Sequence, residues 1–286
     1  MARASVFLYV LLTLSVMIAV AVALSFGRQV YNSVNLHRAV KSAMMPKGSV
    51  TAPVVVYPSP SSSEDHHSAF LFATTLMCAL QSSGSAPPLA PPGCISLMTF
   101  GGRNNAWLLA TSPAEVWLVF RGTATKTEWR QNLHMQQVAF AGGNVHKGFS
   151  RAYISMRAAI DSALTRLNPR VVNVVGYSLG AALAQLCVVD LSGIPQLNLI
   201  AIASPRVGDV AFAKLVPHKL HSKMLLLNTS DIVCDLPLAV HPNATRPNLP
   251  FTYQHPHFAT FFNTNHGSWK ANHDIATYRD QAFAIF

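Results

Sequence analysis

The chain has few charged residues, and acidic side chains are the scarcer kind. Only 11% of its 286 residues are charged, with 11 acidic residues against 21 lysines and arginines, which gives a formal net charge of +10. Residues 1–62 hold five of the basic residues and no acid, so the remainder carries 16 − 11 = +5. Neither a basic repeat nor an aromatic–basic motif accompanies this excess, so we expect no nucleic acid partner. Two interpretations of the basic excess stay open. It could attract the protein to an anionic lipid surface, or it could be ordinary solubilising charge.

Cysteine is also rare, with four residues in the chain: Cys78, Cys94, Cys187 and Cys234. No C-x-x-C pair and no Cys/His cluster is present, so we expect neither a metal site nor a cofactor. Cys78 and Cys94 bracket a loop rich in Ser, Pro and Gly, which they could close as a disulfide. Cys187 falls in a helical pattern and is more typical of a buried apolar residue.

Long apolar runs are absent except at the start, where residues 6–24 carry no charge. That run is about as long as a membrane-spanning helix and longer than the core of a usual signal peptide. We therefore expect a signal anchor over residues 1–25, with a cleaved signal peptide as the alternative because Ala21-Val22-Ala23 is a small-x-small site. Residues 26–62, which end in a Pro- and Ser-rich stretch, are expected to form a stem, and residues 63–286 a single catalytic domain.

The orientation of the anchor receives conflicting signals. More Lys and Arg follow the apolar run than precede it, which favours a cytoplasmic C-terminal side. The sequon that begins at Asn243 and the Cys78–Cys94 pair favour the opposite side. We expect a membrane-anchored protein with a lumenal or extracellular catalytic domain, or a secreted protein if the segment is cleaved.

From residue 63 onward, helical patterns alternate with short β-branched runs. A capping serine followed by acids at 63–65 predicts the start of a helix. Further helices are predicted over 148–167 and 179–191, and strands over 106–110, 116–120, 171–175, 197–203 and 224–227. This alternation is typical of a mostly parallel central sheet with helices on both faces, so the predicted fold class is α/β.

The most informative motif is Gly176-Tyr177-Ser178-Leu179-Gly180, a G-x-S-x-G turn between a β-branched run and an Ala-rich helix. In this arrangement a sharp strand-to-helix turn raises a serine hydroxyl above the sheet, and the two glycines allow the close packing. The motif predicts that Ser178 is a nucleophile, whereas an isolated Gly-rich turn would be the alternative interpretation.

A serine nucleophile needs a base and an acid that orients the base, and on such a sheet the acid precedes the histidine in the chain. Asp231 follows the strand over 224–227 through a short turn and is the preferred acid, with Asp235 in reserve. Asp209 more plausibly caps a helix. The residues alone leave the histidine open; His273, at a loop-to-helix junction, stands beside His241, His255, His257 and His266.

An oxyanion hole should accompany the nucleophile. One donor is expected from the backbone N–H of Leu179, directly after Ser178. A second is expected at the strand-to-loop junction that ends in Thr123, whose hydroxyl could add a side-chain donor. A strand-end salt bridge at Arg121 and a simple turn are the alternatives there.

Several motifs in order resemble the fungal-type, class 3 lipases of the α/β-hydrolase fold. They are Phe120-Arg121-Gly122-Thr123, Val145-His146-Lys147-Gly148-Phe149, the Ser178 elbow, Ser204-Pro205-Arg206-Val207-Gly208, Asp231-Ile232-Val233 with Leu236-Pro237, and His273 with Tyr278. The resemblance spans roughly residues 66–280. It implies Ser178, Asp231 and His273 as the catalytic triad, Thr123 and Leu179 as oxyanion donors, and a lid over 124–137 in which Trp129 meets lipid.

Two departures from the family pattern stand out. Tyr177 occupies the elbow position where histidine is usual, and Asn132 stands in the lid where aspartate is common; neither removes a catalytic group. The implied function is hydrolysis of lipid esters, in the manner of a triacylglycerol lipase, at a membrane or emulsion interface. A phospholipase A1 or a mono- or diacylglycerol lipase is the alternative substrate class, and a membrane-tethered, non-catalytic binding domain is the non-enzymatic alternative.

Overall fold

The computed structural model describes residues 66–83, 88–101, 105–122, 135–191, 193–243, 246 and 248–285. Within them a seven-stranded sheet has the order β1-β2-β3-β6-β7-β8-β11. Its strands are β1 (Ile95–Phe100), β2 (Ala106–Ser112), β3 (Glu115–Phe120), β6 (Val171–Tyr177), β7 (Gln196–Ile202), β8 (Ser222–Asn228) and β11 (Thr260–Phe262). The pairs from β3 to β11 are parallel, whereas β1–β2 and β2–β3 are antiparallel. The predicted α/β class with a mostly parallel sheet is confirmed.

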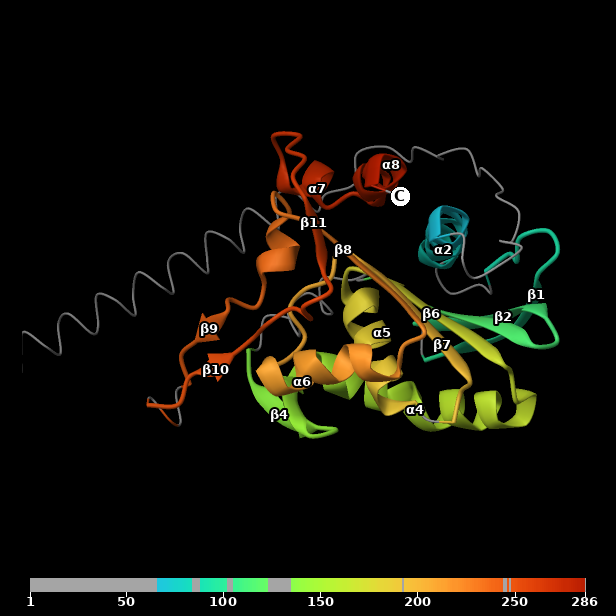
Figure 1. Ribbon diagram of the computed structural model, residues 1–286, viewed down its shortest axis with the longest axis horizontal. Coiled ribbons are helices and arrows are strands. Elements are labelled where there is room, and N and C mark those ends of the chain that lie inside the picture. The colour runs from blue at the N-terminus through green and yellow to red at the C-terminus, as the bar shows by residue number, and fades with distance from the viewer. Residues whose placement is uncertain are drawn as a thin grey trace, which may run out of the picture. The chain divides into compact units, whose positions relative to one another are not determined.

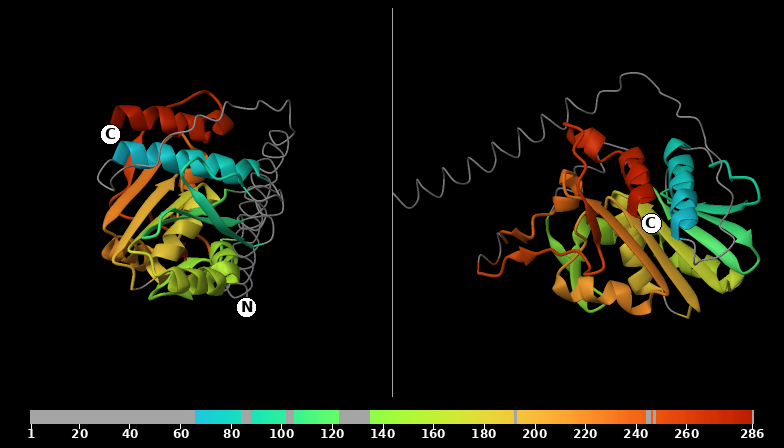
Figure 2. Two further views of the ribbon diagram at one scale, coloured as in Figure 1. Left: turned by 90° about the vertical axis from the view of Figure 1, so that its right-hand side faces the viewer. Right: turned by 45° about the horizontal axis from the view of Figure 1, so that its top comes forward.

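Helices cover both faces of this sheet. Figure 1 and Figure 2 show α2 (His66–Ser82) and α8 (Ile275–Ile285) on one face, with α4 (Lys147–Leu167), α5 (Leu179–Asp190) and α6 (Val210–Leu215) on the other. On α4, buried residues recur every three or four positions, as on an amphipathic helix that covers a sheet. On α5, every residue from Gly180 to Val189 is buried, because α5 lies between α4 and the sheet.

The β-branched runs that predicted the central strands are buried on both faces of the sheet. Val172, Val174 and Val175 of β6 are each 0% exposed, because a strand covered on both faces has no polar side. Asn173 interrupts this run, and its side-chain amide donates to Glu115 Oε1 at 2.8 Å. Its Oδ1 accepts from Asn198 Nδ2 at 2.8 Å, so Glu115, Asn173 and Asn198 form one hydrogen-bonded series across β3, β6 and β7.

Smaller elements were not predicted from the sequence. They are the hairpins β4 (Gln137–Phe140) with β5 (Gly143–His146) and β9 (Val240–His241) with β10 (Phe251–Thr252), the 3-10 turns η1 (Val216–Lys219) and η2 (Ile232–Asp235), and helix α7 (Trp269–Asn272). All of these have four residues or fewer, too short to produce a periodic pattern. The elements between β8 and α8 carry the chain from Asp231 to His273.

The predicted Cys78–Cys94 disulfide is wrong in this structure, where all four cysteines are free. The two thiols have different charged neighbours. Burial raises the pKa of both thiols. The Arg279 charge opposes this rise at Cys78 and the Asp274 charge adds to it, whereas the Glu115 charge adds to the rise at Cys94. Cys78 lies on α2, which packs against α8, whereas Cys94 directly precedes β1. Cys187 is buried, as predicted.

Two further expectations concern the sequon and the apolar run. Asn243, the first residue of the sequon, is only 8% exposed, and its Oδ1 accepts from the Arg246 N–H at 3.2 Å. Residues 6–24 lie outside the described residues, as does the stem. Among the residues that are described, no helix is long and apolar enough to cross a membrane.

Candidate active site

Ser178 lies in a strained turn between β6 and α5. Its φ of 57° and ψ of −124° are values that few L-residues adopt, and its N–H donates to the Ile202 carbonyl at 2.9 Å. The glycines on either side make this turn possible. A Cβ on Gly176 would lie 2.1 Å from the Gly180 oxygen, and one on Gly180 would lie 2.2 Å from the Phe120 oxygen. The turn therefore presents the Ser178 hydroxyl at the carboxyl end of β6.

Asp231 follows β8, and its side chain is entirely buried. Its Oδ1 accepts from the Val233 N–H at 3.0 Å, which caps η2. Its Oδ2 lies 2.6 Å from His273 Nδ1. The carboxylate is thus held by the turn that follows it and points one oxygen at the imidazole.

His273 lies between α7 and α8 and is 9% exposed. Its Nε2 lies 2.8 Å from Ser178 Oγ. With the proton on Nδ1, the ring donates to Asp231 and accepts from the Ser178 hydroxyl. Of the five histidines that the sequence left open, His273 is therefore the one that meets both Ser178 and Asp231.

Tyr177 holds the histidine in place from the elbow itself. Its ring stacks on the His273 ring with centroids 5.1 Å apart and planes at 26°, and its hydroxyl donates to the His273 carbonyl. Burial raises the pKa of Tyr177, followed by the effect of the Asp231 charge, so the hydroxyl stays protonated as a donor. The departure from the family's usual histidine therefore adds a contact to the base.

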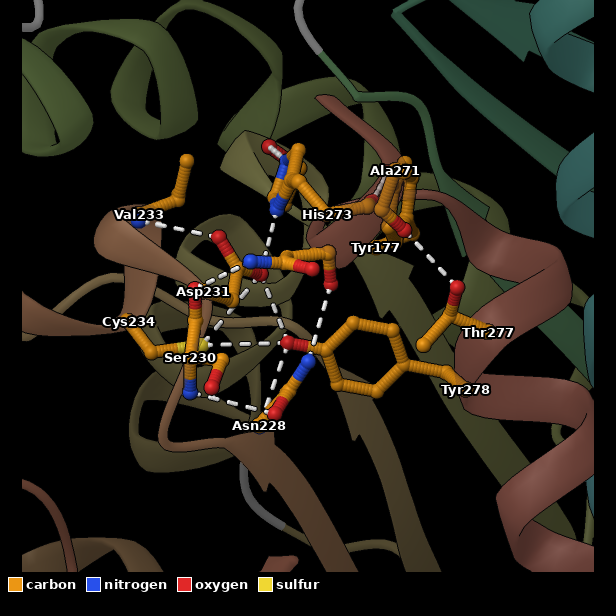
Figure 3. Close-up of polar contacts among 12 residues, drawn as sticks. Tyr177, Asn228, Ser230, Asp231, Val233, Cys234, Ala271, His273, Thr277 and Tyr278 are labelled. Carbon is orange, nitrogen blue, oxygen red and sulfur yellow. Dashed lines mark hydrogen bonds and ion pairs between the residues drawn. The ribbon is translucent and has the colours of Figure 1, made fainter. Parts of the chain in front are cut away.

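Two more groups converge on Asp231 Oδ2, as Figure 3 shows. The Tyr278 hydroxyl donates to this oxygen at 2.6 Å, and the Cys234 thiol donates to it at 3.6 Å. Burial raises the pKa of both groups, and the Asp231 charge raises both further. Cys234 also raises the pKa of Tyr278, whereas the hydrogen bond with Tyr278 lowers that of Cys234 by less than burial raises it, so both groups keep the protons that they donate. Sequence reasoning noted Tyr278 only as part of the terminal segment and missed Cys234.

Two asparagines join the loops that carry the acid and the base. Asn228 donates through Nδ2 to the carbonyls of Thr264 at 2.8 Å and Asn272 at 3.1 Å. Asn272 in turn donates to the Ser230 carbonyl at 2.9 Å. Sequence reasoning missed both, because an asparagine that binds backbone groups far along the chain leaves no local motif.

The other candidate acids have different partners. Asp235 accepts from Arg206 Nη2 at 2.7 Å, and Asp190 pairs with Arg157 Nε at 2.5 Å. Asp209 caps α6 by accepting from the Phe212 N–H at 2.9 Å, as predicted. Within the described part of the chain, no three His, Cys, Asp or Glu side chains gather as metal ligands would.

Part of the predicted site lies outside the described residues: Thr123, the lid residues Trp129 and Asn132, and the rest of 123–134. Leu179 is described and is the first residue of α5. The N–H groups of a first helical turn have no acceptor within the helix, so its amide is suited to bind an oxyanion.

A mostly parallel sheet covered on both faces, with a serine turn between a strand and a helix, places this chain in the α/β-hydrolase class of folds. Comparison with known proteins is more specific. Residues 117–241 match the family model described as Lipase (class 3). Residues 117–241 are therefore similar to the class 3 lipases.

Two curated relatives show the extent of the similarity. The chain is 28% identical over 165 residues to a chloroplastic phospholipase A(1), DAD1, of Arabidopsis thaliana, covering 48% of this chain and 37% of that protein. It is 35% identical over 130 residues to secreted mono- and diacylglycerol lipase A of Penicillium cyclopium, covering 42% of each. The chain thus spans about two fifths of the length of these relatives.

A solved structure supports the fold over a longer stretch. The Rhizomucor miehei lipase in its native propeptide complex aligns with a TM-score of 0.51 at 24% identity, covering 70% of this chain and 75% of that one. At this level of identity the likeness concerns the fold alone.

Proposed function

We propose that this chain is a serine hydrolase that cleaves the carboxylic ester bonds of lipids through a covalent acyl-enzyme. The observation that supports it most directly is the unbroken series of contacts from Ser178 Oγ to His273 Nε2 at 2.8 Å and from His273 Nδ1 to Asp231 Oδ2 at 2.6 Å. A hydroxyl, an imidazole and a buried carboxylate in this order are the parts that nucleophilic acyl transfer requires.

In the proposed reaction His273 accepts the proton of Ser178 as that oxygen attacks the ester carbonyl. The charge of Asp231 stabilises the imidazolium that forms. The oxyanion accepts from the Leu179 N–H and, in the proposed role, from Thr123. His273 then protonates the leaving alcohol, and a water molecule that His273 deprotonates hydrolyses the acyl-enzyme and restores the serine.

The substrate is proposed at two levels. The coarser proposal is that the substrate is a lipid ester, which is supported by the match of residues 117–241 to the class 3 lipase family model. At the finer level we propose activity like that of a triacylglycerol lipase. Phospholipase A1 and mono- or diacylglycerol lipase are the alternatives, because relatives carry both of those names.

The domain organisation and location remain proposals of the same kind. We propose a signal anchor or signal peptide over 1–25, a stem over 26–62 and the catalytic domain over 63–286, with the last part lumenal or extracellular. The name of the secreted Penicillium relative supports an extracellular location. Peptide mapping of the mature protein would test it, since a mature N-terminus near residue 24 means cleavage and an intact N-terminus means an anchor.

The experiment that tests the function measures fatty-acid release from triacylglycerol emulsions and from anionic phospholipid vesicles in parallel. The control is Ser178→Ala, which removes the nucleophile but only one buried oxygen. We expect release from at least one lipid and a loss of at least about 10³-fold in the control. A folded protein that releases fatty acid from neither lipid, or equally with and without Ser178, would overturn the proposal.

A further inference from the structure

The chain between Asp231 and His273 carries five large apolar side chains that the body of the protein does not cover. These side chains, here the apolar patch, have the following exposed fractions: Ile232 43%, Leu238 56%, Val240 60%, Leu249 63% and Phe261 58%. Single exposed apolar residues are ordinary on a protein surface, but a group of them drawn from one connected region is typical of an interaction site.

The β9–β10 hairpin presents two of these residues on one outward face. Val240 pairs with Thr252, and His241 pairs with Phe251. The two residues of each pair lie on the same face of the hairpin, and successive pairs lie on opposite faces. Tyr253, next along β10, is 2% exposed and donates its hydroxyl to the Met135 carbonyl at 2.9 Å, so its face turns toward the body. Val240 and Leu238 are on the opposite face. Figure 1 and Figure 2 show the hairpin projecting from the sheet and its helices.

The rest of the patch connects this hairpin to the catalytic acid. Ile232 directly follows Asp231 in η2. Phe261 lies on β11, where its ring meets that of His255 with centroids 6.5 Å apart. His255 in turn lies 2.8 Å from the Cys234 carbonyl of η2 through its Nε2. The patch therefore borders the loop that carries Asp231.

Cations outnumber acids in this region. Residues 236–273 contain no Asp or Glu, whereas Arg246 and Lys270 are both exposed. The nearest preceding acid, Asp235, is paired with Arg206 at 2.7 Å, and the nearest following acid is the exposed Asp274. A surface that combines exposed apolar side chains with more cations than acids is complementary to an anionic lipid surface.

We propose that the apolar patch, led by the outward face of the β9–β10 hairpin, is the surface with which this protein rests on an anionic lipid bilayer. Val240, Leu238 and Leu249 enter the headgroup region, while Arg246, between β9 and β10, lies at the level of the phosphates. The inference deepens the proposed lipid ester hydrolysis and rests on it for its purpose, because contact at this surface brings lipid to the edge of the Ser178 site.

The test uses the full chain and places a tryptophan on the hairpin. Because the tryptophan reports only on its own surroundings, membrane binding by the N-terminal apolar run does not obscure the result. Val240→Trp and, as a matched control, Ile154→Trp are each made in the Ser178→Ala protein. Ile154 lies on α4 and is 54% exposed, close to the 60% of Val240. Each variant is mixed with vesicles of brominated phosphatidylglycerol or brominated phosphatidylcholine, and tryptophan emission is compared with that of the Ser178→Ala parent.

We expect the added emission of Val240→Trp to move to shorter wavelength and to be quenched at least about twofold by phosphatidylglycerol, while that of Ile154→Trp stays unchanged. Equal quenching at both positions, or none at Val240, would overturn the proposal. Equal quenching by phosphatidylcholine would overturn the assignment to an anionic surface. A blue shift without lipid that grows with protein concentration would assign the patch to a second copy of the chain instead.

Activity separates this inference from the proposed function. Val240→Asp with intact Ser178 should lose about tenfold or more of its hydrolysis of phosphatidylglycerol vesicles and keep its hydrolysis of a soluble short-chain ester, whereas Ile154→Asp keeps both. A wild-type protein inert on every ester, whose Val240→Trp form is nevertheless quenched, would overturn the hydrolase and leave the lipid surface standing. Loss of soluble-ester hydrolysis in Val240→Asp would count against the surface role.

Discussion

Asp231 is a carboxylate without exposed surface, and four groups donate to its two oxygens. They are His273 Nδ1, the Tyr278 hydroxyl, the Cys234 thiol and the Val233 N–H. A buried charge is tolerable only when it is hydrogen-bonded and paired in this way. The same donors set the direction of the oxygen that faces the imidazole, so stability and orientation depend on the same contacts.

Tyr278→Phe tests that dual role. The change leaves Asp231 Oδ2 with one strong donor fewer and removes the acceptor of the Asn228 N–H, which lies 3.2 Å away. We expect kcat on a soluble ester to fall about tenfold with little change in KM, and the free energy of unfolding to fall by about 1–3 kcal/mol.

The matched control for this variant is Tyr253→Phe, which removes a buried hydroxyl from the Met135 carbonyl. It should lower stability without the fall in kcat. If both variants lower kcat alike, Tyr278 acts only through the stability of the protein.

At the level of elements, the elbow depends on how closely α5 approaches β6 and β3. Gly176 and Gly180 face each other and the end of β3 at distances that no side chain can occupy. Ser178 adopts its positive φ within this contact. The strain is therefore maintained by the packing of a strand end against a helix start, which the flanking elements determine together.

Gly176→Ala measures the cost of opening that contact. Its Cβ would meet the Gly180 carbonyl oxygen at 2.1 Å, so α5 must move or the protein must unfold. We expect a loss of more than about 3 kcal/mol in urea unfolding, or no folded protein.

Gly193→Ala is the control for the backbone alone. Gly193 has a φ of +75° and nothing within 4 Å of the added Cβ. It should cost only about 1 kcal/mol. Similar losses in the two variants would show that the approach of α5 to β6 is not what restricts position 176.

At the level of the whole molecule, stability should depend on pH through His255. Burial lowers the pKa of His255 from 6.5 to about 4, with the nearby Arg206 charge acting in the same direction and the Cys234 carbonyl opposing it. Between these values the unfolded chain binds a proton that the folded protein does not. Stability is therefore complete above about pH 6.5 and falls as pH drops toward 4.

The expected loss is roughly 3 kcal/mol at most between pH 7 and pH 4, from the 1.36 kcal/mol that corresponds to one pKa unit. Urea unfolding of the wild type and of His255→Gln over this range measures it. The variant keeps a donor for the Cys234 carbonyl but does not titrate, so its stability should fall less steeply with acid. Identical slopes would mean that other groups carry the pH dependence.

The sequence by itself determined the features that rest on local pattern. The β-branched run over 171–175 predicted a buried strand, and the glycines at 176 and 180 predicted a tight turn that presents Ser178. The alternation of such runs with helical patterns predicted the fold class. The class 3 lipase resemblance added Asp231 and His273 as expectations, which the residues alone had left among several acids and histidines.

Only the tertiary structure decided which distant groups meet. Choosing His273 over His255 required the register of β11 on β8 and the path through α7, and no spacing along the chain encodes either. Cys234 contacts Asp231 three residues away, and Asn228 contacts Asn272 44 residues away. The thiols of Cys78 and Cys94, which the sequence placed on either side of one loop, are both free. Periodicity reports which face of an element is buried, whereas the partner of a buried polar group depends on how separate elements pack.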